Sequence, residues 1–464
     1  MRVFALLSAV LVASAVGADE MDDILGGFEE EDPDFAIEEA TVTGVDERWW
    51  DVSGSVEVSA SINYRDHRSA TGTDYEGLQR LRSRLNLALD FDLPEYEYFR
   101  DGKIKIEGWG FYDAAYLING RSNYTSEVRN EYELDAQIGE AWIQASPADM
   151  LDIKIGRQIV IWGRSESLRV LDILNPLDNR EPGRVDIEDL RRPLGMAKVE
   201  TFFEEWALSL IAIPEIRFNL SPVFGSDFYP VPVRAFVPRE RKVKDFKDTE
   251  FAGRLIGIFS GWDISFHGAS YWNDSARLYN PVAPAAPIPP AAFPPYTSRH
   301  DRLWMVGSGG NYTVGSWLFK YEAAYVNGLG FAGTNDDKNR FDAFLGVEYY
   351  GLTDTTIVLE GVNRHLFDHE VGIKKIDGIR QNMQELALRV TQNFWNDTLH
   401  VTLLGIGFGW DLGYGSVARL DIAYDIQDAL SISGGILLYQ NGSSPLLDKI
   451  GYNDRLLLNI KYSF

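Results

Sequence analysis

Apolar and polar residues alternate along the last ten residues of the chain. One phase is apolar or aromatic and holds Leu456, Leu458, Ile460, Tyr462 and Phe464. The other phase is mostly polar. Because successive side chains of a β-strand point to opposite faces, this pattern predicts a strand with one apolar face and one polar face. Similar alternation extends over residues 52–64, 81–93 and 418–426.

The alternating segments are long enough to cross a membrane. They run to about 10 to 13 residues, which matches a tilted membrane-spanning strand of roughly 9–11 and exceeds the usual soluble strand of about 5–6. A secreted all-β protein would also alternate, but over shorter strands. We predict about 18 strands (16–18) along the chain. Their predicted centres lie near Val58, Leu87, Trp109, Gln137, Ile155, Val199, Leu210, Leu255, Phe266, Val306, Phe319, Leu345, Val358, Leu388, Leu403, Ile422, Ile436 and Leu458.

Short and long links alternate between the predicted strands. Residues 203–205 and 351–355 form short links, whereas residues 163–194 and 215–250 form long ones. Short periplasmic turns and long external loops are typical of bacterial barrels, and this phase places both termini in the periplasm. The sequence therefore predicts an all-β protein, an antiparallel up-and-down transmembrane β-barrel over residues 48–464, in the outer membrane of a Gram-negative bacterium.

Aromatic residues support this topology, because Tyr and Trp gather where barrel strands meet the two membrane interfaces. Nine of them fall near predicted strand ends: Trp49, Trp50, Tyr64, Trp142, Trp206, Trp262, Trp272, Trp317 and Trp395. At the end of the chain, Tyr462 and Phe464 resemble the C-terminal signal by which the outer-membrane assembly machinery takes up its substrates. We therefore expect that machinery, outer-membrane lipid and lipopolysaccharide as partners. The sequence leaves the oligomeric state open.

The first residues predict a secretory signal peptide over residues 1–18. Arg2 precedes an apolar run from Val3 to Val16, and small residues lead to a cleavage site after Ala18. The run of about 14 apolar residues is too short for a hydrocarbon core that needs roughly 20. A lipoprotein would need a cysteine at the cleavage site, and the chain has no cysteine.

The segment after the signal peptide is strongly acidic. Residues 19–47 hold thirteen acidic residues and no basic one, about half of the net charge of −25. Like-charge runs of this kind stay disordered and often serve as interaction tails, so we predict a disordered periplasmic segment. Within it, Ile24, Leu25 and Phe28 form an apolar island that could bind a periplasmic or exporter partner. A soluble spacer is the alternative.

Composition excludes several classes of protein. Without cysteine there can be no disulfide, thiolate metal site or catalytic thiol. No stretch of 18 or more apolar residues follows the signal peptide, which excludes a helical membrane protein. No catalytic constellation stands out, and His365 and His369 lack the glutamate of the His-Glu-x-x-His metal motif. We expect no enzymatic activity, no metal, no cofactor and no nucleic-acid partner.

Charged residues occupy inward phases of several predicted strands. Arg82, Arg84 and Asp90 are examples from the second strand. Isolated charges are expensive to bury without partners or water, so this lining predicts a wet lumen or a dense network of ion pairs. About 18 strands leave an aqueous channel unless loops plug it.

The long link after the fifth predicted strand has the most distinctive composition. Residues 164–192 contain six Arg, seven acidic residues and no Lys, and Arg is the better partner for fixed bidentate carboxylate pairing. We predict that residues 164–194 fold into the barrel as a constriction or plug, and an external lid held by its own ion pairs is the alternative. The constriction residues we expect are Arg164, Glu166, Arg169, Asp172, Asp178, Arg180, Glu181, Arg184, Asp186, Glu188, Arg191 and Arg192.

The motifs in this stretch resemble those of a known protein family. They are Gly156-Arg157-Gln158, Trp162-Gly163-Arg164-Ser165, Asn175-Pro176-Leu177-Asp178 and Glu181-Pro182-Gly183. The chain resembles a large proteobacterial family of outer-membrane barrels known only as a domain of unknown function. Members are often encoded beside RND-type exporters and a periplasmic lipid-handling protein, so the resemblance implies a hydrophobic or lipid-like cargo for some of them. The density of Arg and acidic residues after Trp162 departs from the family pattern.

The function that these patterns favour is a porin-like channel. It would pass or export solutes across the outer membrane, with residues 164–192 narrowing the lumen. The rival hypothesis is a non-conducting partner barrel, either bound to an export system or forming the sheath of an extracellular electron-transfer complex.

Overall fold

The computed structural model describes residues 48–96, 99–229, 246–279, 297–443, 447–448 and 450–464. The predicted signal peptide and acidic segment lie outside these ranges. Ile24, Leu25 and Phe28 therefore lie outside the described residues.

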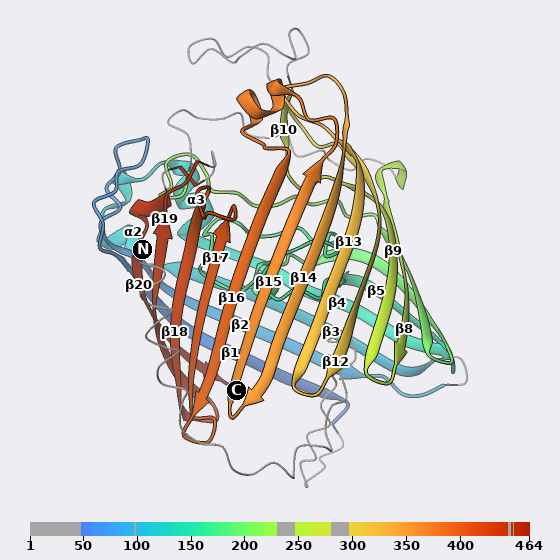
Figure 1. The fold of residues 1–464 in the computed structure, drawn as a ribbon. Helices are drawn as coiled ribbons and strands as arrows, with labels where there is room; N and C mark the ends of the chain where they lie inside the picture. The colour runs from blue at the N-terminus through green and yellow to red at the C-terminus, as the bar shows by residue number, and fades with distance from the viewer. Residues whose placement is uncertain (1–47, 97–98, 230–245, 280–296, 444–446, 449) are drawn as a thin grey trace.

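The described chain forms one closed antiparallel barrel of 18 strands (Figure 1). The sheet closes where the first and last strands pair, from Ser55 opposite Ser463 to Asn63 opposite Arg455. The barrel strands are β1 (Trp50–Asn63), β2 (Gly77–Asp92), β3 (Arg100–Asp113), β4 (Leu134–Ala148), β5 (Leu151–Gln158), β6 (Leu194–Phe203), β7 (Trp206–Ile213), β8 (Glu250–Phe259), β9 (Trp262–Trp272), β12 (Arg302–Val314), β13 (Trp317–Leu329), β14 (Lys338–Leu352), β15 (Thr355–Leu366), β16 (Asn382–Phe394), β17 (Leu399–Phe408), β18 (Gly415–Gln427), β19 (Leu430–Gln440) and β20 (Arg455–Ser463).

The predicted fold class and strand number are confirmed. Each of the 18 predicted centres falls inside one of these strands. Short links join the strands at one end of the barrel, such as the two residues between β18 and β19, and long links join them at the other. The end of β20 lies at the short-link end (Figure 1). In outer-membrane barrels this end faces the periplasm.

Outward and inward residues alternate as the sequence pattern predicts. Along β1, Val56, Val58 and Ile62 are exposed on the outer face, while Ser55 and Ser59 are buried toward the lumen. An apolar outer face is what lipid contact requires. The strand pattern and the membrane environment therefore agree.

One predicted interface aromatic is placed differently. Trp142 lies in the middle of β4 and faces inward, where Lys154 Nζ is 4.0 Å from its ring centroid. The prediction of an interface position is wrong for Trp142, because aromatic residues also serve as partners of lumen cations. The other eight aromatics of that set begin, end or flank a strand.

Short elements decorate the long links. The link between β3 and β4 holds α2 (Ala115–Ile118), η1 (Arg121–Asn123) and α3 (Ser126–Tyr132). The remaining ones are α4 (Ile187–Leu190), η2 (Phe246–Asp248), η3 (Ile373–Asp377), η4 (Ile450–Tyr452) and the β10 (Arg277–Tyr279) and β11 (Thr297–Arg299) pair. Among the described residues, no helix has both the length and the apolar character needed to cross a membrane.

Candidate functional site

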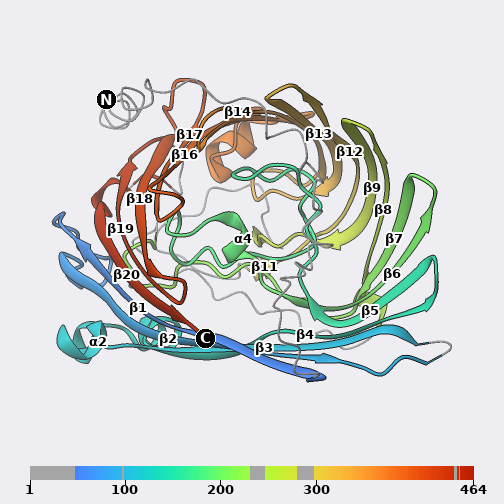
Figure 2. The ribbon, with the colours of Figure 1, turned by 90° about the horizontal axis from the view of Figure 1, so that it is seen from below.

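Residues 159–193, which we call the inner segment, link β5 to β6 and lie inside the barrel. Viewed along the barrel, the ring of strands surrounds this segment and its helix α4 (Figure 2). The segment contacts inward residues of strands far from its own place in the sequence, from β9 around to β19 and β2. The structure thus brings most of the predicted constriction residues into the lumen.

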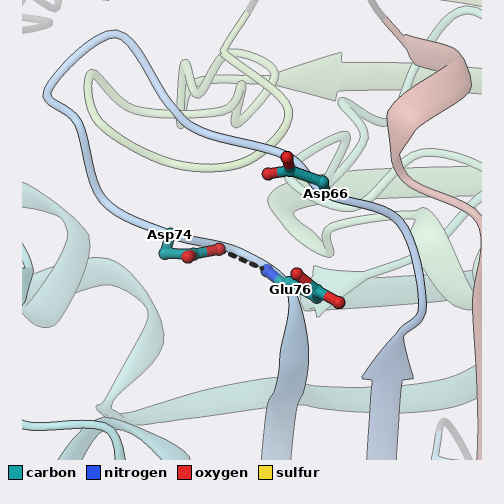
Figure 3. Close-up of side chains that lie close together, drawn as sticks. All are labelled: Asp66, Asp74 and Glu76. Carbon is teal, nitrogen blue, oxygen red and sulfur yellow. Dashed lines mark hydrogen bonds between the residues drawn. The ribbon is translucent and has the colours of Figure 1, made fainter.

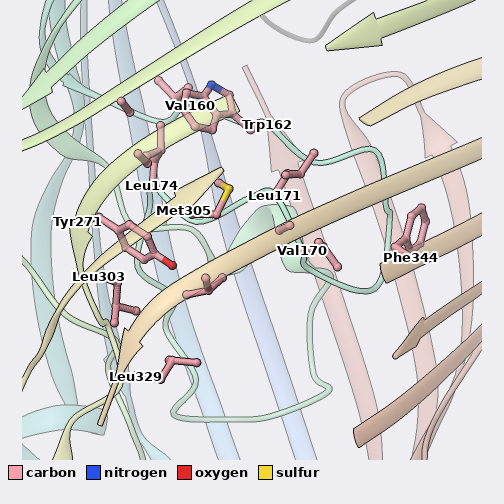
Figure 4. Packing of buried hydrophobic residues seen from close by; sticks show 14 of the residues in the cluster. Val160, Trp162, Val170, Leu171, Leu174, Tyr271, Leu303, Met305, Leu329 and Phe344 are labelled. Carbon is pink, nitrogen blue, oxygen red and sulfur yellow. The ribbon is translucent and has the colours of Figure 1, made fainter. Parts of the chain in front are cut away.

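An apolar core fixes the inner segment to one sector of the wall (Figure 4). Trp162, Val170 and Leu171 belong to the segment, and Leu171 is 0% exposed. They pack on inward residues such as Met305 of β12 and Phe344 of β14. Each fully buried side chain of this size contributes roughly 1.5–3 kcal/mol. The inner segment is therefore held by a packed core rather than by charges alone.

Two wall glutamates bind the backbone of the inner segment. Glu322 on β13 accepts hydrogen bonds from the backbone N–H of Arg164 and, at 2.9 Å, of Leu171. Glu360 on β15 accepts from the N–H of Glu166 at 2.8 Å and from that of Ser167 at 3.0 Å. Both glutamates are 1% exposed. Buried donors and acceptors that would otherwise be unpaired are satisfied here.

Ion pairs connect predicted constriction residues to the wall. Their partners lie on four strands around the barrel. The pairs are Arg164 with Asp263 of β9 at 2.7 Å, Glu166 with Arg389 of β16 at 3.4 Å, Asp186 with Arg389 and with Arg419 of β18, and Glu181 with Arg80 of β2. The segment therefore bridges distant parts of the wall.

The remaining constriction residues pair mainly within the segment. Asp172 is buried between Arg169 and Arg191, each with Nε 3.0 Å from its Oδ2. Arg180 chelates Asp178 at 2.8 and 2.6 Å. The other contacts are Arg184 Nε to Glu181 Oε2 at 3.7 Å and Arg192 Nη1 to the Phe218 carbonyl at 2.6 Å. The side chain of Glu188 lies outside the described residues.

The pKa values of carboxyl groups in the inner segment are shifted in opposite directions. Burial opposes ionisation of Glu181, but the charge of Arg80 and its neighbours outweighs burial and holds the pKa of Glu181 well below its usual range. Burial likewise opposes ionisation of Asp186, and Arg419 is the main group that lowers its pKa. Burial raises the pKa of Glu166. Glu181 and Asp186 therefore serve as ionised anchors.

The inward face of β2 to β5 differs chemically from the wall beneath the inner segment. Arg84 lies over Trp109 at 4.5 Å, and Lys105 pairs with Glu107 at 2.7 Å. These side chains and Asp90 are only half-buried, unlike the wall beneath the inner segment. Further along β2, the partly buried Arg82 lies over the Phe111 ring at 3.8 Å and pairs with Asp113 at 3.3 Å.

A cavity of about 400 Å³ lies at the short-link end of this sector. Its lining includes Lys103, Gln144 and Asp152, which stand on the inward faces of β3, β4 and β5. The polar lining suits water and charged solutes.

An acidic cluster lies on the link between β1 and β2. Asp66, Asp74 and Glu76 place carboxylate oxygens within 4.8 Å of one another (Figure 3). All three residues are exposed, and Arg68 is 3.4 Å from Asp74. Exposed acidic groups are often close together without a bound cation, so we assign no metal site to this cluster.

Sequence reasoning missed several wall residues that hold the inner segment. Asp263, Glu360 and Arg389 were not among the predicted site residues. Each is a charged residue on the inward phase of its strand, so strand phase was the signal available. Tyr462 of β20 and Phe464, which follows that strand, are exposed. Phe464 exchanges backbone hydrogen bonds with Gly54 of β1 at 2.9 and 3.0 Å.

Comparison with known proteins agrees with this geometry. The family described as a protein of unknown function (DUF1302) matches residues 3–464. The fold is similar to that of OccAB4 of Acinetobacter baumannii, with a TM-score of 0.52 and 9% identity over 90% of this chain and 98% of that chain. For OccAB3 of the same organism the TM-score is 0.50, with 10% identity over 89% of this chain and 99% of that chain. No curated protein is significantly similar to the sequence.

Proposed function

Because the chain belongs to the DUF1302 family of proteins of unknown function and has the porin-like fold of an outer-membrane barrel, we propose that it is a solute channel. In this proposal, solutes cross the outer membrane through the lumen, and the inner segment narrows their path. Residues 164–192 are then the constriction, and the inward face of β2 to β5 is the wall of the passage.

The observation that supports this proposal is the unequal burial of the lumen wall. Inward residues on β13, β14 and β15, such as Ala324, Phe344 and Val362, are buried beneath the inner segment. Inward residues on β2 and β3, such as Ala88 and Lys105, are only half-buried. The segment thus covers one sector of the wall, and water-accessible side chains remain on the other.

The lining of the proposed passage bears on the cargo. Lys105 with Glu107, and Arg84 with Trp109, present both signs of charge beside an aromatic ring. Rings and paired charges suit amphipathic solutes, which have a flat apolar part and a polar group. We therefore favour amphipathic organic solutes over a purely hydrophobic cargo.

The position of the passage is tested with two matched cysteine variants in this cysteine-free chain. Ala88 and Ala324 are both inward-facing alanines, but Ala88 is half-buried and Ala324 is 1% exposed. In planar bilayers, a bulky charged thiol reagent should lower the conductance of Ala88→Cys and leave that of Ala324→Cys unchanged. A conducting Ala88→Cys channel that is indifferent to a reagent shown by mass to have reacted would place the passage elsewhere.

Channel activity itself is tested by deleting the constriction. The purified protein should conduct, and deletion of residues 164–192 should raise its single-channel conductance because the covered wall becomes part of the lumen. Absence of conductance from both the intact protein and the deletion variant would contradict the channel hypothesis. That outcome would favour a non-conducting partner barrel.

A further inference from the structure

A small cavity lies where the inner segment meets the wall and the long-link end of the barrel. Its open volume is about 10 Å³, room for about one water-sized particle. Five charged residues contribute to its lining: Arg80 of β2, Glu181 and Arg184 of the inner segment, Asp227 of the link after β7, and Arg455 of β20.

The charges around this cavity do not balance. Arg455 Nη2 is 2.9 Å from Asp227 Oδ2, so these two residues neutralise each other. Glu181 pairs with Arg80 and is also the nearest acid to Arg184, at 3.7 Å. That distance is too long for a hydrogen bond. Three guanidinium groups and two carboxylates therefore leave one positive charge in excess.

Two guanidinium nitrogens at this site need an acceptor. Arg80 Nε and Arg184 Nη1 are buried, and neither has a hydrogen-bond partner among the residues that the structure describes. An uncompensated buried cation is costly, and so is an unpaired buried donor. The rest of the lining includes Tyr75, Tyr116 and Tyr132, which add no negative charge while they are protonated. Burial, and after it the charge of Arg80, lowers the pKa of Arg184, and the opposing charge of Glu181 does not offset them.

We propose that this cavity binds one monatomic inorganic anion, chloride in ordinary salt, between Arg80 and Arg184. The anion accepts the unpaired N–H groups and cancels the excess charge. Because Arg184 belongs to the inner segment and Arg80 to the wall, the bound anion fastens the two together. The site lies where the constriction meets the wall, and it holds its ion for stability rather than for transport.

The first test compares the intact protein in sodium chloride and in sodium gluconate at equal ionic strength. Gluconate is too large for the cavity, whereas a bound chloride stabilises the folded state by mass action. The apparent unfolding temperature at a fixed scan rate should rise with chloride by a few degrees and then saturate. Arg184→Gln should abolish this rise. Arg121→Gln, which removes an exposed arginine outside the cavity, should keep it. An equal response in both salts would overturn the proposal.

The second test stays decisive if Arg184→Gln fails to fold. Crystals of the unchanged protein grown in sodium bromide should show an anomalous scattering peak between Arg80 and Arg184. A water molecule or a carboxylate of the chain at that position, without bromide, would refute the anion site. Neither result bears on whether the barrel conducts, so the channel proposal is tested apart from this one.

Discussion

At the scale of single residues, two glycines shape the wall that receives the inner segment. Gly307 and Gly309 lie on the inward face of β12 beneath Leu171. A methyl group on Gly309 would come within 2.9 Å of Leu171 Cδ1, and one on Gly307 would overlap Leu171 and the Ala323 carbonyl. Glycine is required here by the close approach of a side chain rather than by backbone conformation.

Gly307→Ala should therefore loosen the inner segment. Overpacking of a core costs roughly 1–3 kcal/mol, and here the segment is the part that can move. We expect a larger and noisier single-channel conductance in planar bilayers. Gly268→Ala is the matched control, since a methyl group there meets nothing within 4 Å. Identical behaviour of the two variants would contradict the close packing of Leu171.

A second residue-scale prediction concerns pH. The pKa of Glu181 in the folded protein lies well below its ordinary value of 4.5. Its ionisation therefore stabilises the fold fully above pH 4.5, and this contribution declines as the pH falls toward the folded-state pKa. The difference in unfolding free energy between the wild type and Glu181→Gln should be constant near neutral pH and shrink below pH 4.5. A difference in unfolding free energy that grows as the pH falls would contradict the lowered pKa of Glu181.

At the scale of elements, the inner segment is attached through its backbone as well as its side chains. Glu360→Ala would remove an acceptor for the N–H groups of Glu166 and Ser167. Leaving a buried donor unpaired costs about 1–3 kcal/mol, so the segment should detach more often. In the Ala324→Cys background this should make the cysteine reactive toward a bulky thiol reagent. Glu107→Ala, on the half-buried sector, should leave Ala324→Cys unreactive.

Strands were predictable from the sequence because their period of two is a local property. Lipid demands an apolar outward phase, so Val56 and Val58 identify β1 without any knowledge of its neighbours. The lumen was harder to predict. On β12, Leu303 and Met305 face inward while Trp304 and Val306 face outward, so both phases are apolar there. The expectation of a wet or ion-paired interior does not cover this apolar patch, whose inward side chains pack against the inner segment.

The partners of the inner segment were not predictable for a different reason. Ser165 and Glu360 are 195 residues apart in the sequence, and no local pattern connects them. The abundance of Arg over Lys in residues 164–192 indicated fixed pairing but not the identity of each partner. The composition indicated ion pairs within the segment, such as Arg180 with Asp178, more directly than it indicated the pairs with the wall.

At the scale of the whole molecule, the outer face sets stability in the membrane. Leu345 lies in the middle of β14 and is 71% exposed, which places it near the bilayer midplane. Leu345→Arg should lower the unfolding free energy by about 2–4 kcal/mol in denaturant titrations in lipid vesicles. Val314→Arg, at the end of β12, should cost no more than about 1 kcal/mol because it lies near the interface. Equal costs would contradict this placement of the membrane.

The route of the inner segment also constrains how the protein is made. The segment follows β5 in the chain, yet its partners lie on β13, β15, β16, β18 and β19, up to 257 residues later. While only the first strands exist, Leu171 has no β12 to cover and Asp186 has no arginine on β16 or β18. The observed position of the segment therefore requires the C-terminal half of the wall to be in place. A barrel that lacks its last strands would therefore leave the inner segment without several of the partners that hold it in the lumen.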